Sequence, residues 1–142
     1  MKERFKFRAW NLEKGIMHYN AEDTYDGISE NGIEHSNFSA VLEDNEYIVM
    51  QSTGLKDRNG KLIYEGDILK VVGKQTEEII GCVQWLDDFC KFSLNIANSK
   101  EGKYQSCETF CEFDYLPETE REIIGNIYEN KELLEEQSGN KN

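Results

Sequence analysis

The segment from Met50 to Val72, MQSTGLKDRNGKLIYEGDILKVV, constrains the fold more than any other part of the chain. At its centre, Asp57-Arg58-Asn59-Gly60 is a strong turn sequence, because Asp favours the first position of a turn and Asn-Gly tolerates the positive φ that hairpin turns require. Apolar, β-branched and aromatic residues, which favour strands, follow the turn in Leu62–Tyr64 and Ile68–Val72. The segment therefore predicts short strands around a tight hairpin turn.

Apolar residues elsewhere mostly recur with a period of two, which is the pattern of a strand with one buried face. The alternation is clearest in Cys90–Ile96, and Phe5–Trp10 shows it too. Tyr47–Gln51 and Ile79–Trp85 are rich in β-branched and aromatic residues. Many short strands with glycines at the corners are typical of a small barrel or sandwich. We therefore predict a mainly β fold, built as a small, strongly coiled barrel or sheet.

The hexapeptide pattern E-I-I-G-x-[VI] occurs twice, in Glu78–Val83 and in Glu122–Ile127. One repetition of a short pattern does not indicate a repeat protein, because repeat proteins need several stacked copies to bury their hydrophobic faces. We expect instead that Gly81 and Gly125 mark equivalent bends in two strands of the coiled sheet.

The 142 residues fit one domain, which we place at residues 1–137, followed by a disordered tail over residues 138–142. The domain is expected to begin with a strand and to end with a short helix from Asn130 to Glu136, since Asn is a good N-cap. Residues 20–39 form a polar, acidic arm or loop, which is long for a compact domain. The arm is compatible with an ordered excursion over the barrel and equally with pairing to a neighbouring subunit.

The sequence predicts a cytoplasmic protein that does not associate with a membrane and binds no metal ion or cofactor. No run of about 18 apolar residues occurs, and no secretory signal is recognisable. In a reducing compartment we expect cysteines to be free thiols. Their spacing does not suit zinc, and His18 and His35 lie far from them in the sequence, where we expect exposed side chains. The cysteines are Cys82, Cys90, Cys107 and Cys111.

The net charge of −12 is unevenly distributed along the chain. Residues 1–14 and residues 50–75 each carry more basic than acidic side chains, whereas the remainder is strongly acidic. A solvated acidic surface keeps a protein soluble. The basic segments, by contrast, suggest a face for an anionic partner. Five acids and no basic residue lie in the arm: Glu22, Asp23, Asp26, Glu30 and Glu34.

Three patches of the sequence resemble the YopX family of small phage and prophage proteins. They are Lys6–Asn11 with Lys14 and Met17 after it, Gln51–Ile68, which is the most specific patch, and Ile123–Asn130 with Leu133 and Leu134 after it. Two positions depart from the family pattern, which tends to place Tyr or Phe at Ser52 and often Pro at Lys131. The resemblance implies a β-rich phage or prophage accessory protein in a bacterial host cell, and it implies no reaction.

Three carboxylates cluster in the most specific patch, at Asp57, Glu65 and Asp67. Each has a structural explanation, because Asp57 and Asp67 can accept hydrogen bonds from nearby backbone N–H groups. Glu65 can form an ion pair with Lys61. The alternative is that the three side chains converge on a hard cation in a metal-assisted enzyme. No G-x-S-x-G, H-E-x-x-H or phosphate-loop sequence occurs.

Since no specific catalytic motif is found, we interpret the chain as a non-enzymatic interaction module. Its partner would be a host or phage protein, or a nucleic acid, and a homo-oligomer would cover sheet edges. We call Lys56–Lys61 the hairpin tip and expect it to be exposed. Two alternatives are the metal-assisted enzyme and an acidic decoy that imitates nucleic acid through the acids of the arm. The predicted partner-binding residues are Lys6, Arg8, Trp10, Lys56, Asp57, Arg58, Asn59 and Tyr64.

Overall fold

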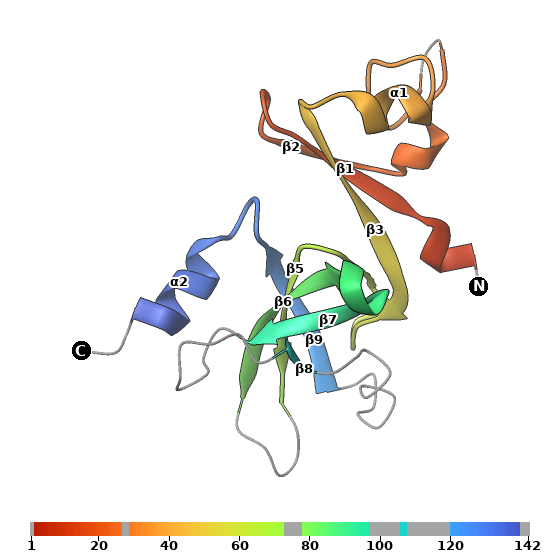
Figure 1. Ribbon diagram of the computed structural model, residues 1–142. Helices are drawn as coiled ribbons and strands as arrows, with labels where there is room; N and C mark the ends of the chain where they lie inside the picture. The colour runs from red at the N-terminus through yellow and green to blue at the C-terminus, as the bar shows by residue number, and fades with distance from the viewer. Residues whose placement is uncertain (1, 27–28, 73–77, 97–105, 108–119, 140–142) are drawn as a thin grey trace. The chain divides into compact units, whose positions relative to one another are not determined.

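The computed structural model describes residues 2–26, 29–72, 78–96, 106–107 and 120–139 (Figure 1). Contacts divide the chain into two compact units, Met1–Gly54 and Leu55–Asn142. The described residues are mainly β, which confirms the predicted fold class. Among the described strands, both sheets run from one edge strand to another without closing, so they are open sheets rather than a closed barrel.

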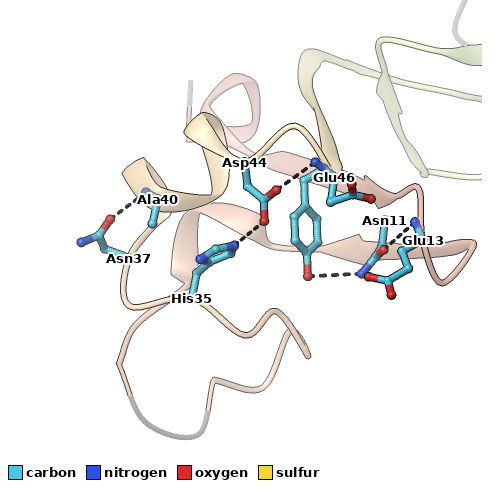
Figure 2. Close-up of polar contacts among 8 residues, drawn as sticks. Asn11, Glu13, His35, Asn37, Ala40, Asp44 and Glu46 are labelled. Atoms are coloured by element: carbon cyan, nitrogen blue, oxygen red, sulfur yellow. Dashed lines mark hydrogen bonds and ion pairs between the residues drawn. The ribbon is translucent and has the colours of Figure 1, made fainter.

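The sheet of the first unit is antiparallel around a central strand. Strand β1 (Phe7–Asn11) pairs antiparallel with β2 (Ile16–Tyr19) on one side and with β3 (Tyr47–Lys56) on the other, in a four-stranded sheet of order β2-β1-β3-β4, where β4 is Leu62–Tyr64. In the turn between β1 and β2, the Asn11 side chain accepts a hydrogen bond from the Glu13 backbone N–H at 3.0 Å (Figure 2). It also accepts one from the Lys14 backbone N–H at 3.0 Å. Gly15 completes this turn at a φ of 65°, which is unfavourable for a residue with a Cβ atom.

The arm predicted at residues 20–39 folds against the sheet of its own unit. It contains the short 3-10 helix η2 (Ala21–Asp23) and an isolated bridge between Tyr25 and Asn37. Ala21 and Ile33 of the arm belong to the same buried cluster as Ala9 of β1. The described residues of the arm thus pack on the sheet of their own unit, and pairing of the arm with a neighbouring subunit stays a prediction.

The short helix α1 (Phe38–Glu43), which was not predicted from the sequence, follows the arm. Asn37 is its N-cap, since its Oδ1 accepts a hydrogen bond from the Ala40 backbone N–H at 2.9 Å (Figure 2). The Phe38 ring packs on the Phe7 ring of β1, with centroids 5.0 Å apart. Six residues are too few for a helical period to be visible in the sequence.

The second unit contains an antiparallel five-stranded sheet in the order β8-β7-β6-β5-β9. Its strands are β5 (Asp67–Val71), β6 (Ile79–Leu86), β7 (Lys91–Ile96), β8 (Ser106–Cys107) and β9 (Arg121–Asn126). The 3-10 helix η3 (Asp87–Phe89) links β6 to β7. The far end of β3 leads through the hairpin tip into β4 (Leu62–Tyr64). The buried core of this unit consists of Ile63, Leu69, Val71, Val83 and Leu94.

The two glycines of the repeated hexapeptide lie on either side of β5. Gly81 of β6 stands opposite Leu69, and Gly125 of β9 stands opposite Ile68, where the pairing register shifts. A Cβ atom at Gly81 would lie 2.5 Å from a backbone carbonyl of β7, and one at Gly125 would lie 2.6 Å from the Asn130 side chain. Both strands therefore need glycine because a neighbour approaches closely.

The turn after β9 is organised by two asparagines. Asn126 Oδ1 accepts hydrogen bonds from the backbone N–H groups of Tyr128 and Glu129 at 3.0 and 2.9 Å, while Asn130 Oδ1 accepts one from the Asn126 N–H. Helix α2 (Glu132–Gly139) follows and runs past the predicted end at Glu136. Residues 138–139 are thus helical rather than part of a disordered tail, and residues 140–142 lie outside the described residues. No described helix is long and apolar enough to cross a lipid bilayer.

Candidate functional site

The hairpin tip is exposed, as the interaction hypothesis requires. Lys56, Arg58, Asn59 and Lys61 are exposed, so three cationic side chains surround one tight turn. Gly60 lies at a φ of 80°, which is the positive φ that the Asn-Gly sequence predicted. The tip thereby presents a compact basic surface on a strongly acidic chain.

Asp57 is the buried anchor of the tip. Its side chain is fully buried, and Oδ1 accepts hydrogen bonds from the backbone N–H groups of Asn59 and Lys61, both at 2.9 Å. Oδ2 accepts from the N–H of Ile123 in β9 at 3.1 Å. Burial by itself raises the pKa of the Asp57 carboxyl, but these three N–H groups and the nearby Lys61 charge lower it by more, so the pKa lies below its usual value. The carboxylate is therefore held ionised by the turn that it organises.

Arg121 at the start of β9 forms further hydrogen bonds between the tip and β9, in addition to the bond from Ile123 to Asp57. Its carbonyl accepts a hydrogen bond from the Arg58 N–H at 2.8 Å, and its Nε donates to the Lys56 carbonyl at 2.8 Å. With the bond from Ile123 to Asp57, three hydrogen bonds join the tip to β9. The backbone of the tip is consequently fixed, while its cationic side chains extend to solvent.

The carboxylates of Asp57, Glu65 and Asp67 do not form a metal site. Among the described residues, no group of three or more His, Cys, Asp or Glu side chains is arranged to hold a metal ion. Both oxygens of Asp57 accept backbone hydrogen bonds, from Asn59, Lys61 and Ile123. Asp67 accepts a hydrogen bond from the Tyr64 N–H at 2.8 Å, which is the structural role expected for it. Cys82 and Cys90 are free thiols. The side chains of Cys107 and Cys111 lie outside the described residues.

Three of the predicted contact residues are buried, so their side chains do not form the exposed surface that was expected of them. Arg8, Asp57 and Tyr64 are 2%, 0% and 6% exposed. The alternating pattern placed Arg8 on a solvated face, but the sheet is covered at that position, and the guanidinium lies 6.0 Å from the centroid of the Tyr19 ring. Trp10 is half-buried. The basic N-terminal strand is thus largely structural.

Lys6 and the acidic arm are joined by local contacts. The Lys6 Nζ lies 3.9 Å from Glu22 Oε2, and Glu22 Oε1 accepts a hydrogen bond from the Phe7 backbone N–H at 2.8 Å. Glu22 therefore helps to attach the arm to β1. The other arm acids, Asp23, Asp26, Glu30 and Glu34, are exposed, and the decoy hypothesis for them stays a prediction.

The two histidines were expected on the surface, and this is wrong for His18. Its ring is buried, and Nδ1 donates a hydrogen bond to the Asn31 carbonyl at 2.9 Å. His35 is half-buried, and its Nε2 lies 2.8 Å from Asp44 Oδ2 (Figure 2). Both rings contact Tyr47, with centroids 5.9 and 5.7 Å away. No sequence motif signals this cluster, because the arm brings it together.

Asp44 holds this cluster to the start of β3. Its Oδ1 accepts a hydrogen bond from the Glu46 backbone N–H at 2.9 Å (Figure 2). That bond, together with the bond from His35, keeps the pKa of Asp44 below its usual value. The hydrogen bond between His35 and Asp44 thus holds the imidazole ring in one orientation. Of the predicted site residues, only Lys6, Arg8 and Trp10 lie in the same unit as this pair.

A pocket of about 400 Å³ lies in the first unit, between β2 and the arm. His18 lines it from β2, together with the half-exposed ring of Tyr19. The arm contributes Tyr25 and two exposed carboxylates, Asp23 and Glu30. The pocket was not predicted from the sequence, because it forms only where the arm folds back beside the strand that it directly follows.

The fold and the hairpin tip together define a small β-rich protein with an anchored basic hairpin. The chain belongs to the YopX family, whose model, described as YopX protein, matches residues 6–135. A crystal structure of protein EF1440 from Enterococcus faecalis is similar, with 27% identity, a TM-score of 0.59, and coverage of 91% of this chain and 96% of that chain. Protein yopX from Bacillus subtilis has 21% identity, a TM-score of 0.49, and coverage of 91% and 95%. No curated protein matches the chain.

Proposed function

We propose that the chain is a non-enzymatic phage or prophage accessory protein that binds an acidic partner through the hairpin tip. The supporting observation is the combination of three exposed cations, Lys56, Arg58 and Lys61, with a turn whose backbone is fixed by the buried Asp57. A fixed turn loses little conformational freedom on binding, which favours affinity. Exposed charges mainly increase the association rate and the specificity for an oppositely charged partner.

Affinity capture from the bacterial host, with and without nuclease, tests this proposal. The bait is the full chain, and the variant reverses the charges at Lys56, Arg58 and Lys61 by substitution with Glu. A matched control reverses three other exposed lysines, Lys2, Lys14 and Lys131. We expect the variant to retain roughly a tenth or less of the captured partner, because each charge contributes up to about 1 kcal/mol, while the control retains most of it.

The nuclease arm identifies the kind of partner. A partner that is lost on nuclease treatment is nucleic acid or is bridged by it, and one that is retained is a protein. Equal capture by the wild type, the tip variant and the control would show that the tip is not the binding surface.

A further inference from the structure

The cationic side chains of the hairpin tip are not neutralised by the chain itself. Lys56, Arg58 and Lys61 are exposed, and none of them forms an ion pair with a described residue. By contrast, Lys70 of β5 in the same unit has a local partner, since its Nζ lies 3.1 Å from Glu78 Oε1. The single carboxylate of the tip is fully buried. The positive charge of the tip is therefore available to a ligand.

The backbone of the tip, by contrast, offers a ligand few hydrogen-bond donors. The N–H groups of Asn59 and Lys61 donate to the Asp57 side chain. The Gly60 N–H donates to the Asp57 carbonyl at 3.0 Å, and the Arg58 N–H donates to a carbonyl of β9. Sites that select phosphate groups commonly add backbone N–H groups to their cationic side chains. These four N–H groups of the tip are already used, so an anion is recognised there by side chains.

The side chains of the tip suit carboxylates on an extended segment. The planar guanidinium of Arg58 matches a carboxylate with two parallel hydrogen bonds, whereas Lys56 and Lys61 act as point charges on either side of it in the sequence. The apex between them is open, because a Cβ atom at Gly60 would meet nothing within 4 Å. The main chain of a partner can therefore approach the turn closely.

The charge of the whole chain favours a short anionic partner over a long one. The net charge is −12, although the tip itself carries three exposed cations. Duplex DNA carries about one negative charge per 1.7 Å of its axis and continues past a single turn, so its further charges meet a strongly acidic chain. Repulsion of this kind acts over about 8 Å at physiological ionic strength. A short acidic segment places its charge at the tip alone.

We propose that the hairpin tip binds a short acidic segment of a protein rather than a nucleic acid. The Arg58 guanidinium pairs with one carboxylate of the segment, and the Lys56 and Lys61 ammonium groups pair with neighbouring carboxylates. This assignment rests on the function proposed for the tip and names the class of its partner.

Titration of the isotope-labelled full chain, followed by NMR of the backbone amides, tests the assignment. The probes are acetyl-Glu-Asp-Glu-Asp-amide and acetyl-Gln-Asn-Gln-Asn-amide, which has a similar shape but no side-chain charge. We expect saturable shifts for Arg58, Asn59 and Lys61 with the acidic probe and at least tenfold weaker binding of the neutral probe. Equal binding of both probes, or shifts confined to other parts of the chain, would overturn the proposal.

A short DNA duplex and one of its single strands, titrated at the same ionic strength, distinguish the two classes of partner. We expect both to bind at least tenfold more weakly than the acidic probe. Equal or tighter binding of either DNA through the amides of the tip would overturn the choice of a protein segment and leave the tip as the binding surface. The function proposed for the tip is overturned separately, by host capture that does not depend on the tip.

Substitutions identify the groups that bind the acidic probe. The tip variant with three Glu substitutions should bind it at least tenfold more weakly, and the control variant with three Glu substitutions elsewhere should bind it within about twofold of the wild type. Arg58→Lys keeps the charge but loses the paired hydrogen bonds, so it should weaken the probe at least threefold, whereas Lys61→Arg should not weaken it. An equal loss in the tip and control variants would refute binding at the tip, and an undiminished affinity of Arg58→Lys would refute the role of the guanidinium.

Discussion

Replacement of Asp57 by alanine removes the acceptor for three backbone N–H groups, those of Asn59, Lys61 and Ile123. Each hydrogen bond to a charged group contributes about 1.5 kcal/mol, so we expect Asp57→Ala to lower the free energy of unfolding of the second unit by about 4 kcal/mol. Asp57→Asn keeps one acceptor oxygen but turns an amide donor toward a backbone N–H, so its expected cost is about 2 kcal/mol. Small domains have only about 5–15 kcal/mol in total, which makes both changes measurable.

Urea unfolding measured by tryptophan fluorescence provides the assay, because the two tryptophans, Trp10 and Trp85, lie in different units. In a Trp10→Phe background the signal comes from Trp85 and therefore reports on the second unit. Asp88→Ala, which removes an exposed acid from the same unit, is the control and should change stability by less than about 0.5 kcal/mol. A loss below about 1 kcal/mol for Asp57→Ala would refute the view that this carboxylate anchors the tip.

Three further predictions concern stability. Gly81→Ala should lower the free energy of unfolding in urea by about 2 kcal/mol or more, because its Cβ would meet a backbone carbonyl of β7. Gly60→Ala has open space around it but a φ of 80°, so it should lower that free energy by about 1 kcal/mol. Equal losses in the two variants would contradict the crowding at Gly81. Asn37→Ala should cost about 1 kcal/mol through loss of the α1 N-cap, measured by thermal unfolding, and Asn37→Gly only a few tenths. The folded-state pKa values of Asp44 and Asp57 are lowered, so their stabilisation is complete above about pH 4 and is lost as the pH falls through the folded values. The Asn variants should therefore show a shallower loss of stability between about pH 5 and pH 3 than the wild type, and an unchanged slope would contradict this.

Local sequence signals predicted the hairpin well because turn chemistry and strand alternation act over a few residues. Asp57, Asn59 and Gly60 adopt the roles that their turn propensities indicate. The repeated Gly81 and Gly125 lie in two strands on either side of β5, although the close neighbours that require glycine were not visible in the sequence. Short-range patterns thus identified most of the described strands and did not identify what packs on them.

The features that the sequence did not reveal are either too short to show a pattern or form only when the chain folds back on itself. β2 and α1 have only four and six residues, which is too short for a clear period. Arg8 and His18 are polar residues in strands, and alternation assigns such residues to a solvated face. They are buried here. The pocket and the histidine cluster exist only once the arm has folded back on its sheet.

The attachment of the hairpin tip to β9 has a consequence for biosynthesis. The bonds from Arg121 to Lys56 and from Ile123 to Asp57 span 65 and 66 residues. Such long-range pairings form late, because a long loop must close before they are made. A nascent chain therefore has only the local bonds from Asn59 and Lys61 to Asp57 in its most recognisable turn until β9 has left the ribosome. Products of premature termination before β9 would carry the hairpin turn without its attachment to β9.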